Sequence, residues 1–127
     1  MAAADTNVLV RLLIQDDPSQ TRRAEAFLQG GRPLWISTVV LVETSWVLSS
    51  VYAWKKAQVL ALLQGLSDSP DFVVQAPQAV RAAVDLFRGS KADFPECLAL
   101  ELARAEGQIP FGTFDRAGSK LPGVVAL

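Results

Sequence analysis

Short apolar segments alternate along this chain with longer segments of helical spacing, and this alternation constrains the fold more than any other feature. The strand candidates are residues 34–36, 72–74, 109–114 and 124–126, and the helix candidates are residues 7–15, 18–30, 38–47, 57–66, 78–87 and 93–106. Such alternation is typical of a parallel sheet whose crossover helices cover both faces. It predicts an α/β fold. A first strand at residues 2–4 is expected only from this context, because Ala-Ala-Ala is poor β sequence.

One domain, over residues 1–127, is the expectation from length, because 127 residues can bury one sizeable core but not two. Half of the residues are hydrophobic and a fifth are charged, as in packed globular proteins. No apolar run approaches the ~18 residues that cross a bilayer, and the N-terminus lacks the features of a signal peptide. We therefore expect no membrane partner and a cytoplasmic location.

The chain has no histidine, and this absence limits the chemistry available to it. It excludes a Ser-His-Asp or Cys-His nucleophile and makes a zinc site improbable. Cys97 is the only cysteine, so no intramolecular disulfide can form, and we expect it in the core. Carboxylates and other hard oxygen ligands remain. The net charge of −1 provides no global basic field, so any nucleic acid must bind at a local patch.

Two aspartates follow strand candidates, where parallel sheets place their ligands. Asp5 comes after the first strand candidate, and Asp115 comes after residues 109–114. Each has a simpler explanation as the N-cap of a following helix. Position alone leaves both roles open.

Glu43 lies in a helix candidate that is apolar on nearly every face, so we expect that helix to be largely buried. Its neighbours three and four positions away include no lysine or arginine. A buried carboxylate must then be protonated, paired with a distant base or bound to a cation. A cation shared with Asp5 and Asp115 would account for all three acids.

Asp93 and Glu96 open the helix at 93–106 with the spacing of a capping box. In that account Asp93 caps the helix and Glu96 reaches back to the Asp93 amide. In the alternative, one acid caps the helix while the other faces the cleft at the carboxyl ends of the strands. The sequence leaves both accounts open.

Four segments together resemble the PIN domain family, and the VapC-type toxin ribonucleases in particular. They are Asp5-Thr6-Asn7-Val8-Leu9-Val10-Arg11, Ser37 to Glu43, Ala92-Asp93-Phe94-Pro95-Glu96-Cys97-Leu98 and Thr113-Phe114-Asp115-Arg116. The resemblance covers essentially the whole chain. It implies a three-layer α/β/α sandwich with a five-stranded parallel sheet, and a Mg²⁺ or Mn²⁺ site with Asp5, Glu43 and Asp115 as its acidic members.

The same resemblance implies further residues and partners. Thr6, Asn7 and Thr113 are candidates to support the site. Proteins of this kind cut specific RNAs, are neutralised by a small cognate antitoxin and usually form dimers. We therefore expect a Mg²⁺-dependent endoribonuclease that is the toxin of a type II toxin-antitoxin pair.

One position departs from the family pattern, which reads roughly D-F-A-D where this chain has Asp93-Phe94-Pro95-Glu96. The additional methylene of Glu96 moves its carboxylate by ~1.5 Å, whereas Mg²⁺ requires oxygen ligands at ~2.0–2.1 Å. Glu96 can still act through a water molecule, or Asp93 can replace it as a ligand. The alternative function is a PIN-fold binding module that has lost activity through this change and acts by RNA or protein contacts.

Three cations lie close in sequence to the acidic positions and are candidates to contact phosphate. Arg11 follows Asp5 by one helical segment, and Arg116 and Lys120 follow Asp115. For each of the three, an ordinary solvated charge on the protein surface explains the residue about as well as a phosphate contact does. A phosphatase or receiver domain is the rival enzyme class, but Asn7 stands where a dehalogenase-type phosphatase needs its second aspartate, and the strand at 72–74 leads to Gln75.

Overall fold

The computed structural model describes residues 2–127, which form two compact units, residues 2–75 and residues 76–127. We call them the N-terminal unit and the C-terminal unit and describe each by itself. No helix in residues 2–127 is both long enough and apolar enough to cross a membrane.

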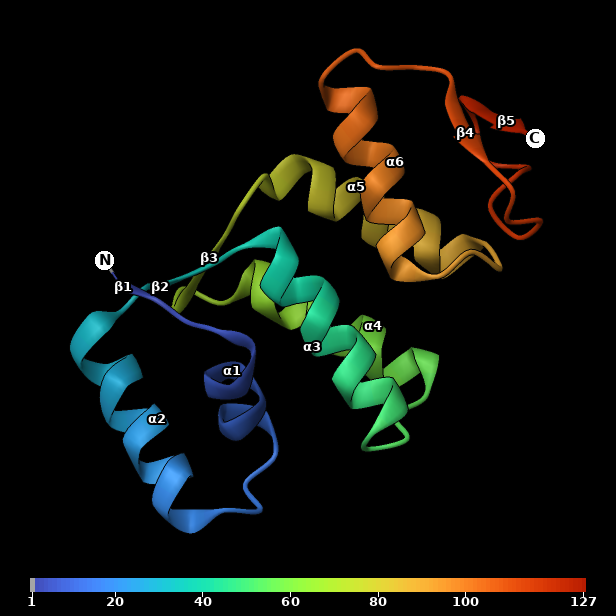
Figure 1. Ribbon diagram of the computed structural model, residues 1–127. Coiled ribbons are helices and arrows are strands. Elements are labelled where there is room, and N and C mark those ends of the chain that lie inside the picture. The colour runs from blue at the N-terminus through green and yellow to red at the C-terminus, as the bar shows by residue number, and fades with distance from the viewer. Residues whose placement is uncertain (1) are drawn as a thin grey trace. The chain divides into compact units, whose positions relative to one another are not determined.

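The N-terminal unit contains three strands and four helices (Figure 1). In chain order they are β1 (Ala2–Ala3), α1 (Thr6–Leu13), α2 (Pro18–Gly31), β2 (Leu34–Ile36), α3 (Thr38–Ser50), α4 (Lys56–Asp68) and β3 (Phe72–Val74). The strands form a parallel sheet in the order β1-β2-β3. Leu34 of β2 pairs with Ala2 on one side and Phe72 on the other.

Short polar residues fix where these helices begin. The Asp17 carboxylate accepts a hydrogen bond from the Gln20 amide at 3.0 Å, and Pro18 occupies the first helical position of α2. Ser37 caps α3 through the Val40 amide at 3.1 Å. Because both caps sit directly between a turn or strand and a helix, they set the direction in which each helix leaves.

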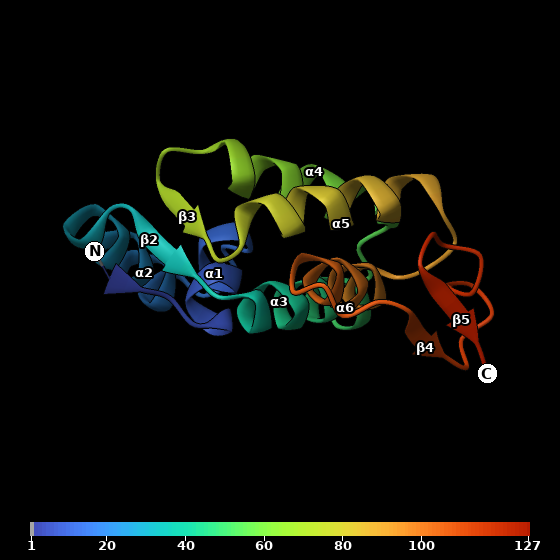
Figure 2. The same cartoon turned by 90° about the horizontal axis from the view of Figure 1, so that it is seen from above.

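The core of the N-terminal unit is aliphatic. Its most buried side chains are Leu9, Leu34, Ile36, Leu41, Leu48 and Leu63. They come from one strand and from three helices, α1, α3 and α4, so the core lies where these elements meet the sheet. Figure 2 shows α1 and α2 beside the sheet, seen from above.

The C-terminal unit contains α5 (Pro77–Gly89), α6 (Phe94–Ala105), β4 (Phe111–Thr113) and β5 (Val124–Ala126). The two helices pack against each other, and the Phe87 and Phe94 rings meet with centroids 6.1 Å apart. The two strands pair in parallel (Figure 2). Cys97 is buried on α6, as expected.

The α/β class, the six helices and the parallel pairing are confirmed over residues 2–127. The expectation of one five-stranded sheet is wrong for this structure. The five strands occur where they were expected, but they form one sheet of three strands in the N-terminal unit and one of two in the C-terminal unit. The positions of the strands could be predicted but not their pairing, because pairing depends on partners that are distant in sequence.

Candidate functional site

Asp5 stands at the end of β1 and caps α1. Its Oδ1 accepts a hydrogen bond from the Val8 amide at 3.0 Å, which is the cap role that the sequence left open. The side chain is nevertheless exposed and lines a pocket together with Asn7 and Arg11. One carboxylate oxygen suffices for the cap, so the cap and a role in binding are compatible. Thr6, the next residue, is buried.

Glu43 is exposed on α3, so the expectation that it is buried was wrong. The helix buries Leu41, Thr44, Ser45 and Leu48, a stripe with the spacing i, i+3, i+4 and i+7. Glu43 lies outside that stripe, while Val39 and Trp46 are 63% and 62% exposed. Burial therefore gives no physical reason for a cation at Glu43.

Two candidate acids of the C-terminal unit, Asp93 and Glu96, lie at the start of α6 and have different hydrogen-bond partners. Asp93 caps the helix, and its Oδ1 accepts from the Glu96 amide at 2.9 Å. Glu96 does not complete the capping box. Instead its Oε1 accepts a hydrogen bond from the Thr113 hydroxyl of β4 at 2.8 Å. The same Thr113 oxygen accepts from the Asp115 amide at 3.0 Å.

Asp115 is held by the turn that follows β4, in which no helix begins. Its Oδ1 accepts from the Ala117 amide at 3.0 Å, so the N-cap explanation for this aspartate was wrong. The turn brings the Asp115 carboxyl close enough to that of Glu96 for each to shift the pKa of the other. The Glu96 Oε2 is buried and receives no hydrogen bond from a donor group in residues 2–127.

Gly118 closes over this pair and was missed by the sequence analysis. A Cβ at this position would lie 2.6 Å from the Cδ and from both carboxylate oxygens of Glu96. Only a residue without a side chain fits there while Glu96 keeps its place. The signal available in the sequence was a glycine three residues after a candidate acid, in a segment rich in turn residues.

The two carboxyls have pKa values shifted in opposite directions. Burial is the main cause that raises the pKa of Glu96, followed by the hydrogen bond to Asp115, and the negative charges of Asp115 and Asp93 act in the same sense. The Thr113 hydroxyl opposes this rise. The hydrogen bond to Glu96 is the main cause that lowers the pKa of Asp115, followed by the Ala117 amide. Of the two neighbouring carboxyls, Glu96 is therefore the one that holds a proton more readily.

A model of the PIN domain family matches residues 2–123. This chain belongs to the PIN domain family. PIN domains are generally nucleases that use divalent metal ions. A solved toxin-antitoxin complex from Klebsiella pneumoniae has a chain that is 22% identical, with a TM-score of 0.39, and the match covers 99% of this chain and 97% of that one. No curated protein matches this PIN domain.

The predicted metal ligands of this PIN domain divide between its units. Asp5 and Glu43 belong to the N-terminal unit, and Asp93, Glu96 and Asp115 belong to the C-terminal unit. Within residues 2–127, neither unit gathers three or more acidic or cysteine side chains into a group that could hold a metal ion by itself. The Glu96 and Asp115 pair fits a hard cation in its chemistry, because it joins two carboxyls and leaves one buried oxygen without a donor.

The three candidate cations differ in how free they are. Arg11 forms an ion pair with Asp16, with Nη1 and Oδ1 2.7 Å apart, and its Nε donates to Gln20 at 2.6 Å. Arg116 and Lys120 are exposed, and no side-chain hydrogen bond or ion pair of theirs occurs in the described part of the chain. Arg11 is thus the least available of the three to a phosphate.

Proposed function

We propose that this PIN domain is a Mg²⁺-dependent endoribonuclease and the toxin of a type II toxin-antitoxin pair. Membership of a family of nucleases supports the hydrolase class. The VapC-type assignment rests on the order and spacing of the four motifs described above. The observation that carries the metal-dependent chemistry is the Glu96 carboxyl beside Asp115, with its buried Oε2 lacking a donor.

Asp5, Glu96 and Asp115 would hold the ion, and Asp93 would take part if Glu96 does not. When bound, the ion supplies water activated for attack on the phosphodiester and neutralises charge in the transition state. Thr113 orients Glu96 through its hydroxyl, and Glu43 would be a fourth catalytic acid. Thr6 and Asn7 support Asp5 from the first turn of α1. Mn²⁺ would serve in place of Mg²⁺.

We also propose that the two units form one PIN domain, since the family match continues across their boundary. The cations Arg116 and Lys120 would contact the RNA phosphates, with Arg11 in a lesser role. A small cognate antitoxin would neutralise the protein, and the toxin would act as a homodimer.

The decisive experiment compares RNA cleavage by the wild type with that by Asp5→Asn, Glu43→Gln and Asp115→Asn, in Mg²⁺ and in chelator. Glu106→Gln is the matched control, because Glu106 is an exposed acid with no proposed role. We expect chelator and all three variants to abolish cleavage and the control to retain it. Cleavage that survives chelator, or survives any one of the three substitutions, contradicts the proposal.

The binding-module alternative is favoured by one observation, the glutamate at position 96 where the family pattern has aspartate. Titration with Mn²⁺ distinguishes the two functions. The nuclease predicts thermal stabilisation that increases with Mn²⁺ concentration and disappears in Asp115→Asn. Stabilisation that is absent, or independent of Asp115, favours a binding module.

A further inference from the structure

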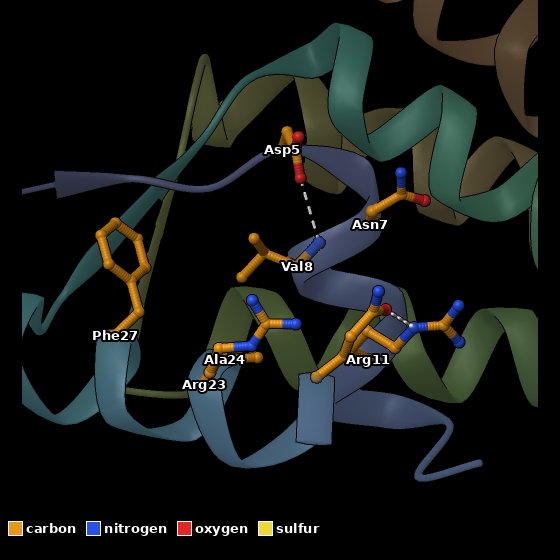
Figure 3. Close-up of a pocket in the computed structure, with 8 residues that line it drawn as sticks. Asp5, Asn7, Val8, Arg11, Arg23, Ala24 and Phe27 are labelled. Carbon is orange, nitrogen blue, oxygen red and sulfur yellow. Dashed lines mark hydrogen bonds between the residues drawn. The ribbon is translucent and has the colours of Figure 1, made fainter. Parts of the chain in front are cut away.

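An open pocket of about 420 Å³ lies between α1 and α2, entirely within the N-terminal unit. It extends from Asp5, the proposed metal ligand, along the facing sides of the two helices (Figure 3). Its other lining residues include Asn7 and Arg11 from α1 and Arg23 and Phe27 from α2. Its volume lies in the range of sites that bind small molecules or single groups of a polymer, ~300–1,000 Å³.

The two arginines of the pocket differ in the charge that they can offer. Arg11 is neutralised by Asp16 and held by Gln20. Arg23 is exposed, and its side chain has no ion pair or hydrogen bond to another described residue. Figure 3 shows the Arg23 guanidinium directed from α2 into the space below Val8 of α1. Arg23 is therefore the cation of this pocket that is available to an anion.

Phe27 supplies an apolar face one helical turn beyond Arg23. Its side chain is 44% exposed, on the pocket side of α2. Residues four apart on a helix place their Cβ atoms ~5–6 Å apart. An exposed aromatic ring next to an available cation is the combination that binds single-stranded nucleic acid, in which bases stack on rings while cations follow the phosphates.

We propose that this pocket binds one nucleotide of a single-stranded RNA next to the cleavage site, with Arg23 on its phosphate and Phe27 stacked against its base. Asn7, which is exposed at the Asp5 end, offers an amide to the sugar or the base edge. This inference rests on the proposed nuclease function for its position relative to the scissile bond. It assigns roles to Arg23 and Phe27, which the acidic motifs do not include.

The test measures binding of a fluorescein-labelled single-stranded RNA of eight nucleotides by anisotropy, in chelator so that the RNA stays intact. The variants are Arg23→Ala, Phe27→Ala and Phe27→Leu. Arg22→Ala is the matched control, since it removes the same charge from the adjacent position but lines a different groove, with Leu12 and Phe72. The three substituted residues, Arg22, Arg23 and Phe27, are all exposed, so thermal melting should show that the variants are folded.

We expect Arg23→Ala to weaken binding and to reduce the slope of log K against log salt concentration by about 0.7, the value for one phosphate of a single strand. Phe27→Ala should weaken binding by about 5- to 150-fold. Phe27→Leu should lose most of the same affinity, because leucine retains apolar area but has no ring to stack. Arg22→Ala should keep the wild-type slope.

The results separate this inference from the proposed function. RNA binding that depends on Arg23 and Phe27 without any cleavage in Mg²⁺ supports the pocket and contradicts the nuclease. Cleavage by Arg23→Ala and Phe27→Ala with wild-type KM, together with unchanged RNA affinity, supports the nuclease and overturns the pocket. After that second result, a protein partner would be the alternative occupant of the pocket.

Discussion

Replacing Gly118 by alanine tests whether the turn after β4 holds the Glu96 carboxyl in place. The new Cβ would lie 2.6 Å from three carboxyl atoms, and ordinary contact begins at 3.4 Å, so the carboxyl must retreat by about 0.8 Å. That movement lengthens the 2.8 Å bond to Thr113 to as much as about 3.6 Å, beyond hydrogen-bonding distance.

The cost in stability should be small, because the displaced atoms are the end of a flexible side chain and the φ of Gly118 lies outside the left-handed region. Loss of one hydrogen bond corresponds to about 0.5–1.5 kcal/mol in the free energy of unfolding. The cost in function should be large, because the Glu96 and Asp115 pair is separated. We expect Gly118→Ala to lose Mn²⁺-dependent stabilisation and RNA cleavage while remaining folded.

Urea denaturation of Gly118→Ala, Glu96→Ala and the double variant measures the energetic coupling between the new Cβ at position 118 and the Glu96 carboxyl. If Glu96 is the group displaced, Gly118→Ala should cost almost nothing in the Glu96→Ala background. Gly65→Ala is the control, since a Cβ there meets nothing within 4 Å and a helical alanine should stabilise by up to about 1 kcal/mol. An equal cost for Gly118→Ala in both backgrounds refutes the reasoning.

Three further perturbations address the same site and the fold. The pKa of Glu96 is raised in the folded state, so its contribution to stability is complete below the ordinary glutamate pKa of ~4.3 and is lost as pH rises through the folded value. The urea midpoint of the wild type should therefore fall as pH rises through this range, and the midpoint of Glu96→Gln should not show this fall. Thr113→Val removes the hydroxyl that opposes the rise, so the Glu96 pKa should move further upward by NMR titration, and no movement would mean that the hydroxyl does not bind the carboxylate. Asp17→Ala removes the cap of α2, so it should lower the free energy of unfolding by about 0.5–2 kcal/mol and leave Mn²⁺ binding unchanged. Loss of Mn²⁺ binding in this variant would contradict the expectation that the cap stabilises only the helix.

The positions of the helices and strands could be predicted because each depends on its own sequence. Asp17-Pro18 and Ser37 mark helix starts with groups that satisfy free amides, and the structure shows both caps. The strand at 109–114 was predicted too long, since only Phe111–Thr113 pairs with β5. Pairing depends on a partner distant in sequence, so periodicity does not determine its limits.

The environment of Glu43 could not be predicted, because an apolar sequence does not determine which face of a helix is covered. Val39 and Trp46 are apolar yet exposed, so α3 buries one stripe and leaves Glu43 outside it. Asp5 illustrates the opposite case. Its position before a helix predicted a cap, and the structure has that cap along with exposure to a pocket.

The glutamate at position 96 is the clearest case in which the chain's own structure changes the meaning of a sequence departure. Measured against the family pattern, the additional methylene of Glu96 displaces a ligand and argues against metal binding. In the structure that methylene carries the carboxyl across to the Thr113 hydroxyl at 2.8 Å and to Asp115, and Gly118 leaves room for it. A shorter aspartate could not reach the same partners without moving α6 toward β4, because ~1.5 Å added to 2.8 Å exceeds hydrogen-bonding distance. Glutamate at 96 and glycine at 118 therefore form one matched arrangement in this chain, because the glycine leaves the space that the longer side chain occupies.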